Sequence, residues 1–261
     1  MKVIPLGISG FIPTEKNETI SVLVIQNDFA ILFDCGTGIK RLFSGKIQNE
    51  LSEIKKLYVF LSHFHMDHIA GLPWLLKAID KPLHFFVPTK PLIDSDGLKS
   101  IKTITNNPFF GLDIEKWPNF GSINSFNTNV FIEDTYEIRI KKQFHSGGSV
   151  GYRFQKFSFI TDVEPEEEYI DFLRGTDLLF LDTMYDDADS IALKAGINKI
   201  LDHGYSKGNA SIAKKADVKR LGLIHLNPGY NSSRLDNLLN ESQEIFSKTF
   251  IPEETKVYVL E

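Results

Sequence analysis

Short apolar runs rich in Val, Ile, Leu and Phe recur along the chain, and they predict β-strands. Helical patterns lie between the later runs, and the last long one places Leu235, Leu238, Leu239 and Ile245 on one apolar face. The strands are expected at residues 3–8, 20–26, 29–33, 57–61, 84–87, 136–141, 152–154, 157–160, 178–181, 220–224 and 256–260, and the helices at 71–78, 206–216 and 232–248. Strands and helices interleaved in this way predict a mixed α/β (α+β) fold.

Residues 88–127 interrupt this regularity. The segment contains Pro88, Pro91, Pro108 and Pro118, and its hydrophobic periodicity is weak. Such a segment is typical of an insertion over a site, so we expect a lid. No linker, repeat or low-complexity block divides the chain. We therefore expect a single domain over residues 1–261 with a lid-like insertion at about 88–127.

Composition and net charge indicate which kinds of molecule the protein is expected to bind. Of the 261 residues, 42% are apolar and 24% are charged, which is ordinary for a globular protein with a sizeable core. The net charge of −5 provides no broad basic surface for a nucleic-acid backbone, so small partners are expected. The single Cys35 excludes an internal disulfide. No signal core or run of 18 apolar residues is present, so we expect a cytoplasmic protein without a membrane segment.

The stretch SHFHMDH gathers three of the seven histidines within six residues: His63, His65 and His68, with Asp67 between them. It begins where an apolar strand ends, so a loop there can direct several side chains inward. Imidazole and carboxylate groups at this spacing suit a divalent transition metal, of which zinc is the usual one. A closed structural zinc finger would require thiolates, which this stretch lacks.

Four more acids and histidines follow predicted strands: Asp34 in FDCGTG, His145 in FHSGGSVGY, Asp162 in ITDVE and His225 in LIHLNP. A carboxylate or imidazole buried after an apolar strand is costly unless it is paired or bound to a metal. A dinuclear metal site would provide such a partner for all four.

These blocks, taken together and in this order, resemble the metallo-β-lactamase superfamily. The resemblance implies a four-layer αββα sandwich that holds two divalent metal ions, with zinc expected and manganese or iron as alternatives. It implies that His63, His65 and His145 hold one metal, that Asp67, His68 and His225 hold the other, and that Asp162 bridges both. Asp34 would accept hydrogen bonds that fix the histidine loop. A metal-bridging hydroxide would be the nucleophile, and Asp67 would orient it or accept its proton.

The segment DHGYSKGNASIAKKADVKRLGLIHLNPGY resembles the branch that includes ribonuclease Z and cyclic phosphodiesterases. It implies that His203, paired with Asp182 of LLFLDTMY, acts on the leaving group or binds a phosphate oxygen. Only 16 residues separate His145 from Asp162, too few for the projecting arm with which ribonuclease Z grips tRNA. We therefore expect a phosphodiesterase acting on a small or cyclic phosphodiester, and we do not expect tRNA as a substrate. A homodimer is kept open, since relatives commonly dimerise.

Three other functions stay open. A thioester or lactone hydrolase would use the same metals without needing Asp182 and His203. A flavodiiron-type oxidoreductase would resemble His-x-Glu-x-Asp-His at the first motif, whereas His65 stands at the second ligand position here. A non-catalytic binding module would be expected to lose ligands, and none is missing.

Overall fold

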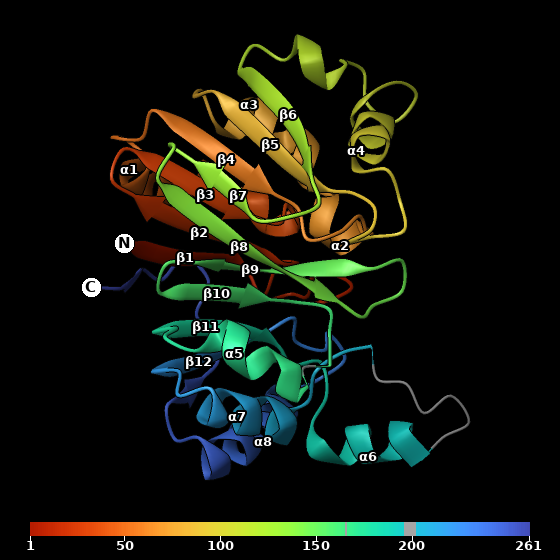
Figure 1. The fold of residues 1–261 in the computed structure, drawn as a ribbon, viewed down its shortest axis with the longest axis vertical. Helices are drawn as coiled ribbons and strands as arrows, with labels where there is room; N and C mark the ends of the chain where they lie inside the picture. Colours follow the sequence, from red (N-terminus) through yellow and green to blue (C-terminus); the bar gives the residue numbers. More distant parts are fainter. Residues whose placement is uncertain (165, 196–201) are drawn as a thin grey trace. The chain divides into compact units, whose positions relative to one another are not determined.

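The computed structural model describes residues 1–164, 166–195 and 202–261. They form two compact units, the first made of residues 1–127 with 253–261 and the second of residues 128–252. Each unit has its own sheet (Figure 1). The single domain over 1–261 stays a prediction. Among the described residues, no helix has the length and apolar character needed to cross a bilayer.

The sheet of the first unit has the strand order β14-β1-β2-β3-β4-β5-β6. Strands β1, β2 and β3 pair antiparallel, and β3 to β6 pair parallel. Asn27 takes a left-handed conformation in the short turn between β2 and β3, as Asn readily does in hairpins. The strands are β1 (Lys2–Gly7), β2 (Ser21–Gln26), β3 (Phe29–Phe33), β4 (Lys56–Phe60), β5 (Leu83–Pro88), β6 (Phe120–Phe126) and β14 (Tyr258–Val259).

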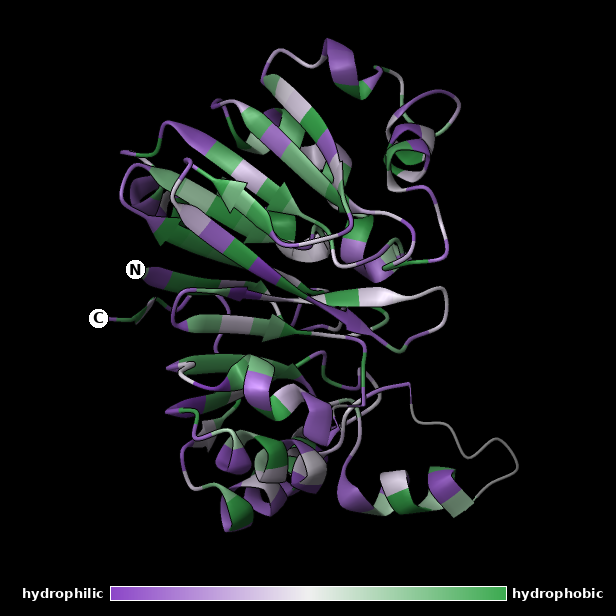
Figure 2. Cartoon of the chain, viewed as in Figure 1, coloured by the Kyte–Doolittle hydropathy of each residue, from purple (hydrophilic) through white to green (hydrophobic). Residues whose placement is uncertain are grey.

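The strands FAILF and KLYVF of the first unit are apolar on both faces, as expected for central strands of a covered sheet (Figure 2). Their inward side chains join those of the surrounding helices in one buried cluster that includes Leu32, Val59, Ile39 and Leu72. The helices are η1 (Thr37–Phe43), α1 (Gly45–Glu50), α2 (Met66–Ile69), η2 (Leu72–Trp74), α3 (Leu75–Ala78), α4 (Gly97–Thr105) and η3 (Ile114–Lys116).

Residues 88–127 contain α4, η3 and β6. Strand β6 pairs with β5, and Ile101, Ile114 and Trp117 belong to the buried cluster of the first unit. Phe109, in contrast, is 71% exposed. Part of this segment therefore extends the sheet and its core, and the closure of the rest over a site stays a prediction.

The sheet of the second unit has the strand order β13-β12-β11-β10-β9-β8-β7 over the residues described there. Strands β7 to β10 pair antiparallel, whereas β10, β11, β12 and β13 pair parallel. The carboxyl ends of the adjacent parallel strands β10, β11 and β12 therefore meet at one edge. The strands are β7 (Val130–Ile132), β8 (Tyr136–Gln143), β9 (Ser149–Phe154), β10 (Phe157–Ile160), β11 (Leu178–Asp182), β12 (Arg220–Ile224) and β13 (Thr249–Phe250).

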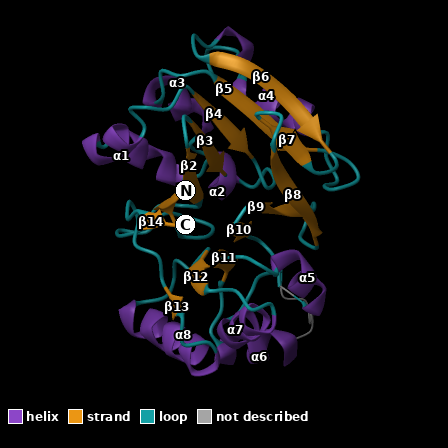
Figure 3. Ribbon diagram, turned by 60° about the vertical axis from the view of Figure 1, so that its left-hand side comes forward, coloured by secondary structure: helices purple, strands orange, loops and turns teal. Residues whose placement is uncertain are grey.

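Helices α7 and α8 lie side by side in the second unit (Figure 3). Ala210, Ala213 and Leu238 are buried on them, as the apolar spacing of both segments predicts. Asn231 caps α8 through its side chain, which accepts a hydrogen bond from the Arg234 amide. The helices of this unit are η4 (Glu167–Tyr169), α5 (Ile170–Leu173), α6 (Asp187–Ala195), α7 (Ser206–Lys215) and α8 (Ser232–Ile245).

Candidate metal centre

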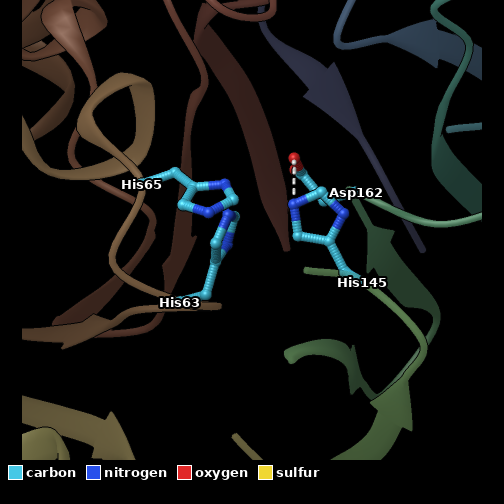
Figure 4. Close-up of side chains that lie close together, drawn as sticks. All are labelled: His63, His65, His145 and Asp162. Carbon is cyan, nitrogen blue, oxygen red and sulfur yellow. Dashed lines mark ion pairs between the residues drawn. The ribbon is translucent and has the colours of Figure 1, made fainter. Parts of the chain in front are cut away.

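The first unit gathers the histidines of SHFHMDH in the loop that follows β4. The His63 ring lies 4.4 Å from the His65 ring and 4.3 Å from the His68 ring, measured between centroids. His63 and His68 are buried and His65 is exposed (Figure 4 draws His63 and His65). Helix α2 begins directly after His65, so Asp67 and His68 lie on its first turn. The loop thus directs several ligand-type side chains from one short segment.

Asp34, directly after β3, fixes this loop through hydrogen bonds to Ser62 and His68. Its carboxylate accepts hydrogen bonds from the Ser62 amide at 2.6 Å, the Ser62 hydroxyl at 2.7 Å and His68 Nδ1 at 2.7 Å. Burial raises the pKa of Asp34, and the neighbouring His68 offsets only part of that rise. Because Nδ1 of His68 is committed to Asp34, Nε2 is the nitrogen that can act as a ligand, and it lies 3.5 Å from Asp67 Oδ2.

The loops after β3 and β4 are locked together by close backbone packing. The Cys35 amide donates to the His68 carbonyl, and the Gly71 amide donates to the Cys35 carbonyl, both at 2.7 Å. A Cβ atom on Gly36 would clash with the backbone of Asp67, so only glycine fits there. The sequence FDCGTG therefore fixes where Asp67 and His68 lie.

The second unit gathers its ligand-type side chains around Asp162. His145 Nε2 lies 3.6 Å and His225 Nε2 lies 3.5 Å from the same atom, Asp162 Oδ1 (Figure 4 marks the His145 contact). Asp162 and His225 are buried, and the side chain of His145 is only 4% exposed. They come from the loops that follow β8, β10 and β12, so the sheet brings together residues up to 80 positions apart in sequence.

Asp182, the last residue of β11, contacts the Nδ1 atoms of two imidazoles of this unit. Its Oδ2 accepts a hydrogen bond from His203 Nδ1 at 2.8 Å, and its Oδ1 lies 3.5 Å from His225 Nδ1. The His203 and His225 rings stack with centroids 5.0 Å apart. Asp182 is fully buried, whereas the side chain of His203 is partly exposed. One carboxylate therefore orients both a ligand-type histidine and a more accessible one.

The charges of this pair stabilise each other. Burial alone would raise the pKa of Asp182, but His203 and His225 outweigh burial and hold that pKa below its ordinary value. Burial likewise lowers the pKa of His203, but Asp182 outweighs burial and leaves it above the ordinary histidine value. The contact thus favours the charged form of each group, the carboxylate of Asp182 and the imidazolium of His203.

Three of the strand-end residues take a left-handed backbone conformation: Asp34 at φ 59°, Asp162 at φ 54° and His225 at φ 55°. This conformation is uncommon outside glycine, although Asp and His adopt it more often than most residues. This conformation turns the chain sharply where an extended strand ends. The side chain therefore does not point to the face of the sheet that the alternation along the strand would predict.

The donor spacing within each unit fits a metal ion. Asp67 with His68, and Asp162 with both His145 and His225, hold oxygen and nitrogen 3.5–3.6 Å apart. This is longer than a normal charge-assisted hydrogen bond. Two ligand atoms on a tetrahedral zinc ion, each at ~2.0–2.1 Å, are separated by roughly 3.3–3.5 Å. In the second unit, ligand atoms of Asp162, His203 and His225 all lie within 4.8 Å of one another.

The structure thus gathers every site residue expected from the sequence into one of two clusters. Ligand sets that draw on both units stay predictions, as do the individual roles. Ser62 was missed, although its hydroxyl links Asp34 to His63 Nδ1 at 3.0 Å. Its place at the end of β4, directly before the first histidine, was the available signal. The contact between the Phe11 amide and Asp67 Oδ2, at 2.7 Å, has no signal in the sequence. The clusters are Asp34, His63, His65, Asp67 and His68 in the first unit, and His145, Asp162, Asp182, His203 and His225 in the second.

Curated relatives of this chain are named ribonuclease Z. The protein from Sulfolobus acidocaldarius is 25% identical over 317 positions, which cover 100% of this chain and 99% of the relative. The protein from Prochlorococcus marinus is 28% identical over 312 positions, covering 95% of this chain and 96% of the relative. Since these alignments are longer than the 261 residues here, the relatives carry segments with no counterpart in this chain.

These relatives correct one expectation. We did not expect tRNA as a substrate, because the net charge is acidic and no gripping arm fits between His145 and Asp162. That expectation is wrong, because near full-length relatives carry the name ribonuclease Z. The physical fault lies in the charge argument. Net charge sums the whole surface and does not describe the potential at the one face that meets a substrate.

Solved structures confirm the predicted fold class, the αββα metallo-β-lactamase sandwich. The metallo-beta-lactamase fold protein YhfI from Bacillus subtilis superposes with a TM-score of 0.75 at 21% identity, covering 98% of both chains. A diphosphatase of the PhnP family gives 0.72 at 16% identity, covering 100% of this chain and 98% of the other. The short form of human tRNase Z gives 0.67 at 18% identity, covering 99% of both.

The family model described as the beta-lactamase superfamily domain matches residues 30–226. This range contains every ligand-type residue of both clusters, from Asp34 to His225. The resemblance seen in the sequence is therefore confirmed, and the chain belongs to the beta-lactamase superfamily.

Proposed function

We propose that this protein is a metal-dependent phosphodiesterase. The observation that carries the proposal is the Asp182–His203 hydrogen bond at 2.8 Å, beside the Asp162 and His225 cluster. A histidine fixed in this way suits the protonation of a leaving alkoxide, which a phosphodiester releases on hydrolysis. The names of the curated relatives support the same reaction, and they include RNA among the phosphodiesters that must be tested.

The proposed ligand sets follow the superfamily pattern. His63, His65 and His145 would hold one divalent ion; Asp67, His68 and His225 would hold the other; and Asp162 would bridge the two. The donor spacing within each unit supports these assignments, and the donors, imidazole and carboxylate, favour zinc, with manganese or iron as alternatives. Two such ions, when bound, would supply Lewis-acid stabilisation of charge on the phosphoryl oxygens and activation of a water molecule.

The residues of the chain have separate tasks in this proposal. Asp67, which the Phe11 amide holds at 2.7 Å, accepts the proton of the attacking water. His203 donates a proton to the leaving oxygen, and Asp182 fixes its tautomer by accepting from Nδ1. Asp34 holds Ser62 and His68, and through them the loop that carries the first cluster.

A substrate panel tests the proposal directly. Wild-type protein is assayed against an aryl phosphodiester, a cyclic nucleotide, a 3′-extended tRNA, a lactone and a thioester, with metal content measured by elemental analysis. We expect two metal ions per chain, turnover of at least one phosphodiester, and loss of that turnover after chelation. His63→Ala should abolish activity, whereas His84→Ala, which removes a strand histidine bonded to Ser122, should not.

Turnover confined to the lactone or thioester would overturn the proposal and favour the alternative hydrolase. Less than one metal ion per chain together with no turnover would favour a binding module. Turnover of the tRNA and turnover of a small phosphodiester are each consistent with a phosphodiesterase. The ratio of the two kcat/KM values identifies the preferred substrate size.

A further inference from the structure

The loop between β1 and β2 presents an apolar tip to solvent. Three consecutive residues, Phe11, Ile12 and Pro13, are exposed, with Phe11 75% and Ile12 52% accessible. Loop tips usually carry polar residues, and a run of three exposed apolar residues works against solubility unless it serves a purpose. The tip does not extend the core of the first unit, since the buried cluster does not include it.

This tip is anchored rather than loose. The Ser9 amide donates to the Glu18 carbonyl at 2.9 Å, which closes the base of the loop. The Ser9 hydroxyl donates to the Ile12 carbonyl at 2.9 Å, and the Thr14 amide donates to the Asn17 carbonyl at 2.8 Å. The loop backbone that carries the apolar side chains is therefore held in a defined place, which lowers the conformational entropy that the loop would lose on binding a ligand.

Phe11 also takes a strained conformation at the tip. Its φ of 63° lies in the left-handed region, which is a genuine outlier for a bulky residue. In this conformation its amide donates to Asp67 Oδ2 at 2.7 Å. The strained residue thus contacts, through its amide, the carboxylate that accepts a proton in the proposed reaction, and the same residue carries the exposed aromatic ring.

We propose that Phe11 is a stacking platform for the aromatic group, a nucleobase or aryl ring, next to the scissile phosphodiester. The inference rests on the proposed function and names the substrate class more narrowly: esters with an aromatic group beside the phosphate. A planar apolar ring that is exposed to water, on a residue whose amide contacts Asp67, offers a surface for the flat face of a base. Bases of single-stranded RNA commonly stack on aromatic side chains. Single exposed aromatic residues are common on protein surfaces, whereas the contiguous run of Phe11, Ile12 and Pro13 is the kind of apolar surface that marks an interaction site.

Binding measurements test this inference without relying on turnover. The affinity of the wild-type protein for uridine 5′-monophosphate is compared with that for ribose 5-phosphate, which has the same phosphate but no base. We expect the nucleotide to bind about tenfold more tightly, as a stacked base provides. Phe11→Ala should remove this difference, and Phe11→Trp should retain it. Phe43→Ala, which removes another exposed phenylalanine of the same unit, should leave it unchanged.

Kinetics and oligomeric state complete the test. With an aryl phosphodiester, Phe11→Ala should raise KM about tenfold with little change in kcat, and with a dialkyl ester it should change neither. Equal base-dependent binding in wild type and Phe11→Ala would overturn the inference, as would a dimer in gel filtration that Phe11→Ala converts to monomer with no change in nucleotide binding. Base-dependent binding that Phe11→Ala removes, in a protein that hydrolyses no phosphodiester, would overturn the proposed function and leave the platform standing.

Discussion

The two clusters of ligand-type residues are built in opposite ways. In the first unit, four of them occupy six consecutive positions, His63 to His68, in one loop after β4. In the second unit, His145, Asp162 and His225 are far apart in sequence and meet only because β10 and β12 belong to one parallel stretch of sheet, next to the loop after β8. Sequence spacing therefore identifies the first cluster, whereas sheet topology creates the second.

The supporting carboxylates differ in the same way. Asp34 reaches one imidazole, His68, and also bonds the backbone and hydroxyl of Ser62. Asp182 lies behind two imidazoles, His203 and His225, that come from different loops. Removal of the Asp34 carboxylate, which orients one loop, should therefore weaken metal affinity alone. Removal of the Asp182 carboxylate, which orients His203 and His225, should weaken both metal affinity and proton transfer.

The largest expected effect comes from Asp162→Asn. The substitution replaces the oxygen that both His145 Nε2 and His225 Nε2 face at 3.5–3.6 Å with a neutral amide. We expect no measurable phosphodiesterase activity and a reduced metal content, measured by elemental analysis and steady-state kinetics. Asp171→Asn, an exposed aspartate of the same unit, is the matched control and should behave like wild type. An Asp162→Asn protein with wild-type metal content and rate would show that this carboxylate is not a ligand.

His203→Ala should have the next largest effect. Loss of a proton donor typically costs ~10²–10⁴-fold in rate, and we expect this loss in kcat for a phosphodiester with an alkyl leaving group. A p-nitrophenyl ester, whose leaving group needs no proton, should lose much less. Metal content should stay at the wild-type level. An equal rate loss for both leaving groups with full metal content would instead assign His203 to the binding of a phosphate oxygen. A loss of metal would make it a metal ligand.

The comparison of Asp34→Asn with Asp182→Asn gives the smallest but most selective effect. Each should weaken metal affinity by about 10–100-fold, because each releases a histidine from its orienting partner. Only Asp182→Asn should also lower kcat when the metal is saturating, since only Asp182 holds His203. Chelator competition gives the affinities and metal-saturated kinetics gives kcat. A kcat loss of equal size in both variants would contradict the division of tasks between the two carboxylates.

The central strands were predictable because they are apolar on both faces. Phe29–Phe33, Phe157–Ile160 and Arg220–Ile224 match the expected ranges, and every residue of the first two is buried. Strand β6 was missed because Phe120–Phe126, FGSINSF, is half polar and partly exposed at the edge of its sheet. Its pairing with β5 comes from backbone hydrogen bonds that side-chain patterns do not encode.

The sequence predicted which residues of the candidate site follow the strands, but it did not predict the contacts between them. The hydrogen bond between Asp182 and His203 is the one that the ribonuclease Z resemblance implied. The role of Ser62 and the contact from Phe11 to Asp67 depend on how distant loops pack, and no local pattern reports that. Gly36 explains part of this loop packing, because a side chain at that position would displace the backbone of Asp67.

The left-handed backbone at Asp34, Asp162 and His225 has a consequence for any attempt to stabilise this protein. Glycine adopts that conformation without steric strain, whereas a residue with a Cβ atom loses on the order of 1 kcal/mol. A screen that selects only for thermal stability would therefore favour glycine at Asp162 and His225, and each gain would remove one of the side chains that define the site. At Asp34 the hydrogen bonds from Ser62 and His68 outweigh the backbone strain. In this fold, the most stable sequence and the functional sequence diverge at the ends of its most regular strands.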